Sequence, residues 1–85
     1  MNLAEAMNTY DIALYTIKNK GFDIELELSE DKEEIVWWMA KKGSIIVSAH
    51  GPLSLLALVD IAERYGENWN KIETGGLYDK LLEQD

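Results

Sequence analysis

Hydrophobic and acidic residues alternate without exception from Phe22 to Leu28. Apolar side chains occupy positions 22, 24, 26 and 28, and acidic side chains occupy positions 23, 25 and 27. A period of two is typical of a β-strand with one buried face and one solvated face. The segment is therefore predicted to be a strand that carries a row of carboxylates on its outer side.

Two further strands are predicted directly after this one. The segment from Glu34 to Lys41 is apolar at almost every position, which is typical of a central strand covered on both faces. The segment from Ile45 to His50 is predicted to be the third strand. A tight turn at Lys42-Gly43 would connect it to the second strand, because glycine readily adopts a positive φ.

Parity along the middle strand decides which tryptophan faces the core, since a slip of one residue exchanges the two faces. A two-residue turn at Lys42-Gly43 pairs Trp38 with Val47, and a first connection of three or five residues agrees with that assignment. The core-facing set is then Val36, Trp38 and Ala40, and the outward set is Ile35, Trp37 and Met39. A three-residue second turn would turn Trp37 inward instead, and this alternative stays open.

Helices are predicted before and after the three strands in the sequence. Residues 2–20 form the first, and Gly21 is a natural end for it. Gly51-Pro52 begins the second, with proline in the first turn, and Gly66 ends it. Leu53 and Leu56 are expected towards its polar side, where either the C-terminal tail or a partner would cover them. The apolar stripes, at helical spacing, are Leu3, Ala6, Met7, Tyr10, Ala13, Leu14 and Ile17 in the first helix, and Leu55, Leu58, Val59, Ile61, Ala62 and Tyr65 in the second.

An irregular tail is predicted for residues 67–85. Trp69 and Ile72 are expected to anchor it to the body, and Thr74-Gly75-Gly76 interrupts it. The segment from Leu77 to Gln84 is long enough for two helical turns, with Leu77 and Leu81 facing inward and Tyr78 as a further candidate for that side. So short a helix needs packing to persist, and a tail behind two glycines could also fold onto a neighbouring subunit.

The predicted fold is α+β, in the order α-β-β-β-α, with two helices covering one face of a three-stranded antiparallel meander and a short C-terminal helix at the end. Residues 1–85 are expected to be a single domain, with a body over 1–66 and a tail over 67–85. The element order of residues 2–65 is similar to that of double-stranded RNA-binding domains. Those domains carry basic residues at the start of the last helix, where this chain has Pro52-Leu53-Ser54-Leu55. RNA binding is therefore not implied.

Composition narrows the classes of function. The 85 residues carry a formal charge of −8 and no cysteine, and 47% of them are hydrophobic. The negative charge argues against direct binding of nucleic acid and of anionic membrane surfaces, and it favours basic partners. The missing cysteines exclude disulfides and suit a reducing compartment. No apolar run is long enough to span a membrane, so a cytoplasmic location is expected.

Catalytic and metal-binding patterns are weak. His50 is the only histidine, and a histidine beside carboxylates is able to transfer protons. A histidine at a strand end that bonds a nearby backbone group explains it more simply. No histidine pair, nucleophile elbow or phosphate-binding loop is present. An enzyme is therefore not expected, and neither a cofactor nor a metal is predicted.

The density of acids is the one unusual feature, with seven between Asp23 and Glu34. Carboxylates in a row repel one another, so folding gains nothing from them. One explanation is a solvated face that resists edge-to-edge aggregation. The other is an interaction surface, because apolar and aromatic residues rimmed by charge are typical of interfaces. The predicted partner-binding residues are Asp23, Glu25, Glu27, Glu30, Asp31, Glu34, Ile35, Trp37 and Met39.

Two hypotheses of function follow. The first is a small acidic protein that binds or inhibits another protein by occupying a basic groove, one that normally holds nucleic acid. Small phage- or plasmid-encoded inhibitors of host defence act in this way, and the analogy rests on size and charge alone. The second is a structural domain that uses the same sheet face to form a homodimer.

Overall fold

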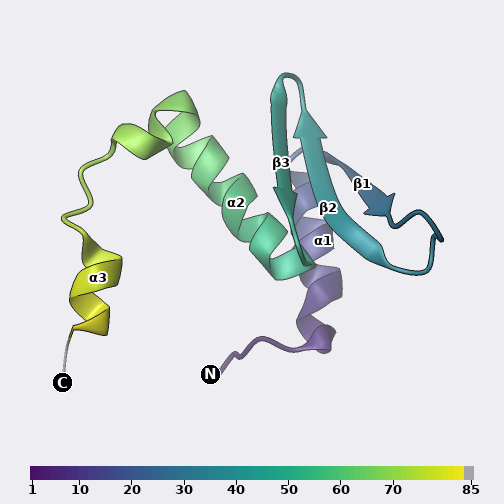
Figure 1. Ribbon diagram of the computed structural model, residues 1–85, viewed down its shortest axis with the longest axis horizontal. Helices are drawn as coiled ribbons and strands as arrows, with labels where there is room; N and C mark the ends of the chain where they lie inside the picture. The colour runs from purple at the N-terminus through teal and green to yellow at the C-terminus, as the bar shows by residue number, and fades with distance from the viewer. Residues whose placement is uncertain (84–85) are drawn as a thin grey trace.

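Three antiparallel strands and two helices form the body of the protein, in the predicted order (Figure 1). The structure is a computed structural model, and it describes residues 1–83. The strands follow one another in the sheet as β1-β2-β3. The α+β class, the antiparallel meander and the short C-terminal helix are thus confirmed. The elements are α1 (Tyr10–Asn19), β1 (Asp23–Leu28), β2 (Ile35–Lys42), β3 (Ile45–Ala49), α2 (Pro52–Tyr65) and α3 (Leu77–Leu82), with 3₁₀ turns η1 (Met7–Thr9) and η2 (Gly66–Lys71).

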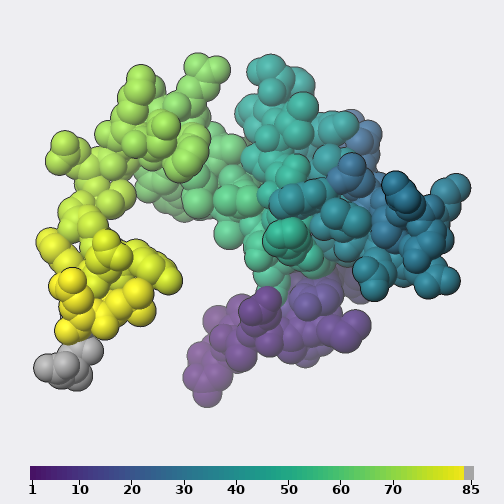
Figure 2. Space-filling model, in the orientation of Figure 1, coloured from purple at the N-terminus to yellow at the C-terminus, as the bar shows by residue number. Residues whose placement is uncertain are grey.

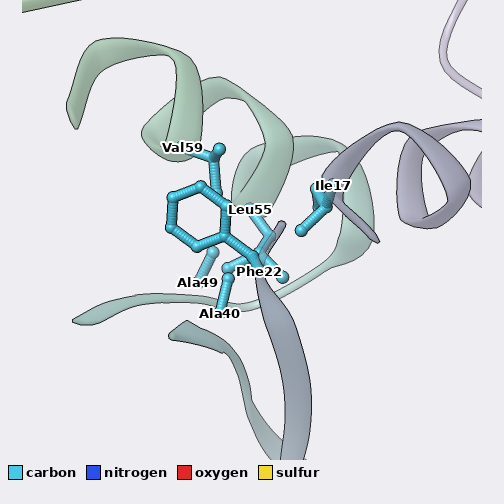
Figure 3. Close-up of a cluster of buried hydrophobic side chains, with 6 residues drawn as sticks. All are labelled: Ile17, Phe22, Ala40, Ala49, Leu55 and Val59. Carbon is cyan, nitrogen blue, oxygen red and sulfur yellow. The ribbon is translucent and has the colours of Figure 1, made fainter. Parts of the chain in front are cut away.

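Phe22 lies at the centre of the core, just before β1, and only 1% of it is exposed. Figure 3 shows its ring between Val59 of α2 above and the two strand alanines below, with Leu55 of α2 beside it. An alanine has no atoms beyond Cβ, so positions 40 and 49 leave room for the ring between the sheet and the helices. The buried cluster consists of Ile17, Phe22, Ala40, Ala49, Leu55 and Val59.

The turn between β2 and β3 differs from the predicted one. It consists of Gly43 and Ser44 and not of Lys42-Gly43, because β2 continues through Lys42. Gly43 has a φ of 58°, a backbone conformation that glycine adopts without a steric cost. The pairing of β2 with β3 is therefore shifted by two residues from the predicted register.

Each tryptophan nevertheless lies on its predicted face of the sheet, because a register shift of two residues preserves side-chain parity. Trp38 pairs with Ala49 and not with the predicted Val47. It packs against the buried cluster, as expected. Trp37 belongs to the opposite face of the sheet, so the predicted assignment of the two tryptophans is confirmed.

The β1–β2 connection is longer than predicted. It has six residues, 29–34, because the register shifts at the end of β1. Glu27 pairs with Trp37, whereas Leu28 pairs with Ile35, and Val36 is left as the extra residue of a β-bulge. Ile35 therefore shares the face of Leu28, and its predicted place beside Trp37 is wrong.

The first helix is shorter than predicted. It begins with η1 at Met7, and Leu3 and Met7 are each 79% exposed, so they do not belong to a buried stripe. Ala6 has an extended backbone, and the Thr9 side chain donates a hydrogen bond to its carbonyl oxygen. This contact begins the helical region four residues after Leu3. Gly21, with a φ of 91°, ends it as predicted.

The helices cover only part of the sheet. Leu26, Leu28 and Val36 were predicted to face the core, yet they are exposed. The end of the sheet near the β1–β2 loop projects beyond both helices in Figure 1, which explains their exposure.

The buried side of α2 is also rotated from the predicted one. Leu56 packs against the core, although it was expected towards the polar side, whereas Ile61 and Tyr65 are exposed. The prediction left Leu53 and Leu56 to be covered by the C-terminal tail or by a partner, and it did not include contact with the first helix. In the structure α1 also packs on this helix, and the buried side turns towards it.

The tail is not anchored as expected. Trp69 and Ile72 are exposed, and none of the residues of α3 is buried, so the predicted inward positions of Leu77 and Leu81 are wrong. Figure 1 shows α3 apart from the body. Gln84, the predicted last residue of this helix, lies outside the described residues. Within residues 1–83, no helix has the length and apolarity needed to cross a membrane.

Candidate protein-interaction face

The face of the sheet that points away from α1 and α2 carries most of the predicted site residues. We call it the outer face. Antiparallel pairing places Glu27 opposite Trp37 and Glu25 opposite Met39. Cross-strand neighbours of this kind have Cβ atoms about 4.5–5.5 Å apart, so the acids of β1 directly flank the apolar side chains of β2. The outer face consists of Asp23, Glu25, Glu27, Trp37, Met39, Lys41, Ile46 and Ser48.

Trp37 is held in place by a stacking contact with His50. The centroids of the two rings are 4.3 Å apart, and their planes are inclined by 21°. The indole is half-buried, and its cover comes from the imidazole and not from a helix. Trp37 is thus a supported, partly exposed ring opposite Glu27, which suits an anchor residue.

The acids of β1 are partly neutralised by lysines. Glu25 Oε2 lies 2.7 Å from Nζ of Lys41, and Asp23 Oδ1 lies 3.6 Å from Nζ of Lys18. Both pairs are solvent-exposed, and such pairs contribute about 0–1 kcal/mol to stability. Among the ion pairs within residues 1–83, none includes Glu27. The acid opposite Trp37 is therefore the one whose charge is least compensated.

The β1–β2 loop holds three more of the predicted residues in an ordered turn. The backbone N–H of Ser29 donates to the carbonyl oxygen of Glu34 at 2.9 Å, which closes the loop. Asp31 accepts hydrogen bonds from the Ser29 hydroxyl and from the N–H of Glu33. These bonds, that of the hydroxyl first, hold the pKa of Asp31 below its ordinary value. The hydrogen bonds that order the loop are therefore made to the ionised form of Asp31.

Five of the nine predicted residues come together on the outer face, and the others do not. Glu30, Asp31 and Glu34 lie on the loop at one end of the sheet, and Ile35 lies at the bulge. The stacking of His50 on Trp37 and the lysine partners of the acids were not predicted. The parity of β3 carried a signal for His50, because it places His50 on the same face as Ile46 and Ser48.

No other constellation of functional groups stands out. Within residues 1–83, no three His, Cys, Asp or Glu side chains gather closely enough to hold a metal ion. The chain matches no protein-family model, no curated protein and no solved structure. What can be inferred about function therefore depends on the outer face and its charges.

Proposed function

We propose that the protein is a binding module whose outer face docks on a basic surface of another protein. The observation that carries the proposal is the pairing of Trp37 and Met39 with Glu27 and Glu25 across one ladder. Aromatic residues and methionine are enriched in interface cores, and charged residues form the rim. Carboxylates at that rim favour a partner rich in arginine or lysine.

A partner groove that normally holds nucleic acid meets these requirements. Such grooves combine cationic side chains, which contact the phosphates, with aromatic platforms. The acids of β1 would take the place of phosphates, and Trp37 would take the place of a stacked base. The protein would then act as an inhibitor of the groove that it occupies.

A second copy of the chain is a poorer occupant of the outer face. Three carboxylates and one ammonium group lie on it, and the whole chain carries a charge of −8. Two such faces brought together would repel each other, since like charges in contact are costly. Charge thus supports a basic partner over a homodimer at this position.

A photo-cross-linking amino acid at Met39 tests the proposal, and the same amino acid at Ala57 is the matched control. Ala57 is exposed on α2, on the helical side of the molecule. Capture in native cell extract should yield, from position 39 and not from 57, a protein cross-linked at a basic site. Added oligonucleotide should compete with that capture. Equal capture from both positions, or cross-links at Met39 to a second copy of the chain, would contradict the proposal.

A further inference from the structure

The surface of the protein is too large for a folded monomer of its mass. Its accessible area is 7132 Å², whereas a compact monomer of 9.7 kDa exposes about 5,100 Å². Its radius of gyration is 15.2 Å, and about 12 Å is expected for 85 residues. The excess is about 2,000 Å², which lies within the range of about 1,000–2,500 Å² that each subunit loses in an obligate dimer.

Part of this excess comes from α3. Successive residues of a helix are 100° apart, so the four large apolar residues of α3 fall within an arc of about 140° and its charged residues fall on the opposite side. The apolar side consists of Leu77, Tyr78, Leu81 and Leu82, all of which are exposed. A helix of six residues is not stable in water without packing. The apolar side of α3 therefore needs a surface to pack against.

A hollow of about 360 Å³ offers such a surface on the body. It lies between the N-terminal segment, α1 and the first turns of α2. Apart from Glu5 and two threonines, its walls are apolar, and they include Leu3, Ile12, Ala13, Leu53 and Leu56. Ile12 and the adjacent Tyr15 extend the apolar surface beyond the hollow, and both are exposed. The hollow and the apolar side of α3 thus match in chemical character.

The tail places α3 apart from its own body (Figure 1). Gly75 and Gly76 have φ values of 74° and 65°, which redirect the chain just before α3. Figure 2 shows open space between α3 and the N-terminal segment. Folding α3 back onto its own hollow would cover the same two surfaces as an exchange of α3 between two copies, but it would leave Met7 and Tyr15 exposed. An exchange also brings a second body alongside the first, and that body can cover these residues as well.

We propose that two copies of the chain form a homodimer in which α3 of each copy packs into the hollow of the other. The two contacts are equivalent, as in an isologous dimer, and exchange of a short terminal helix is a common route to such dimers. The outer face of each sheet takes no part in this contact. The dimer therefore presents two outer faces, and the two surfaces can be tested separately.

Sedimentation velocity over a range of concentrations tests the dimer. Wild type should be dimeric, and Leu81→Glu should raise the dimer dissociation constant by about a hundredfold, since the substitution removes a central apolar contact and adds a charge. Leu28→Glu is the matched control, because Leu28 is also an exposed leucine and lies at the far end of the sheet. It should leave the dimer intact. A wild type that is monomeric throughout, or a Leu81→Glu variant that dimerises normally, would overturn the proposal.

Cysteine cross-linking decides the arrangement even if Leu81→Glu fails to fold. The natural chain contains no cysteine, so Leu81→Cys and Ile12→Cys variants can be purified separately, mixed and oxidised. A disulfide between positions 12 and 81 of two chains is expected in the mixture. A double variant that forms this disulfide within one chain, or a mixture that forms none, would show that α3 does not pack on the second copy.

Discussion

The imidazole of His50 stacks on the indole of Trp37, with 4.3 Å between the ring centroids. The contact joins the two arms of the β2–β3 hairpin, since Trp37 lies in β2 and His50 directly follows β3. The contact fixes the only tryptophan of the outer face without burying it. The sole histidine of the chain thus has a structural role at the candidate interface, which differs from the backbone-bonding role that its position suggested.

Removal of the imidazole is predicted to loosen Trp37. His50→Ala should lower the free energy of unfolding by about 0.5–1.5 kcal/mol, the range of an aromatic pair. His50→Phe keeps a ring in the same place, so it should retain most of that stability. Urea denaturation of the three proteins measures the difference. Equal losses in both variants would mean that the stack contributes nothing.

The two adjacent tryptophans are predicted to differ in their contribution to folding. Trp38 packs against the core, and Trp38→Ala should cost about 2–3 kcal/mol, somewhat less than the roughly 3–5 kcal/mol of a fully buried tryptophan. Trp37→Ala removes only the stack and should cost about 1 kcal/mol. Denaturant midpoints at one fixed protein concentration give the comparison, because dimerisation makes stability depend on concentration. The reverse order would mean that the faces of β2 are assigned wrongly.

The hydrogen bonds of the β1–β2 loop are predicted to depend on pH. The pKa of Asp31 is lowered in the folded protein, chiefly by the Ser29 hydroxyl. The stabilisation is therefore present above the ordinary pKa of an aspartate and is lost as the pH falls through the lower folded-state pKa. Ser29→Ala should raise the pKa of Asp31 towards its ordinary value, as NMR titration of the carboxyl carbon would measure. Ser44→Ala, in the other turn, is the control and should leave that pKa unchanged.

Strand parity was predictable from the sequence because it depends only on whether residue numbers are odd or even. The predicted β2–β3 turn was wrong, yet Trp38 lies on the core face as predicted, because the strand pairing changed by two residues and parity was kept. A bulge is different, since it inserts one residue, and the alternating pattern gave no sign of it before Ile35. The stripe of α2 failed for another reason. The spacing of its leucines fits several rotations of the helix, and contact with α1 selects the one that buries Leu56.

The tail shows where prediction from one chain reaches its limit. Leu77 and Leu81 have the spacing of a buried stripe, but both are exposed in the single chain. The pattern and the exposure agree if α3 packs on another copy of the chain. The sequence indicated that Leu53 and Leu56 need cover from the tail or from a partner, but the hollow that they line arises from the packing of α1 on α2 and was not predicted. The exposed α3 and the open hollow are both explained if each packs against the other in a second copy of the chain.

The last prediction concerns the acids of β1 and the partner captured through Met39. The triple variant Asp23→Asn, Glu25→Gln, Glu27→Gln should fold with a change in stability of less than about 0.5 kcal/mol, because its ion pairs are exposed. Association of wild type with a basic partner should slow as salt rises from about 0.01 to 0.15 M, since the screening length falls from about 30 to 8 Å. The triple variant should lose most of that dependence and, at low salt, associate about tenfold more slowly.

The matched control places the same change of charge elsewhere, in the variant Glu67→Gln, Glu73→Gln, Glu83→Gln. All three residues are exposed in the tail, away from the outer face. If the acids of β1 steer the partner, the control should keep most of the salt dependence of wild type. If net charge alone attracts the partner, both variants should weaken association equally. An association rate that neither variant alters would contradict electrostatic docking. The carboxylates of β1 would then be explained as a solvated face that opposes aggregation.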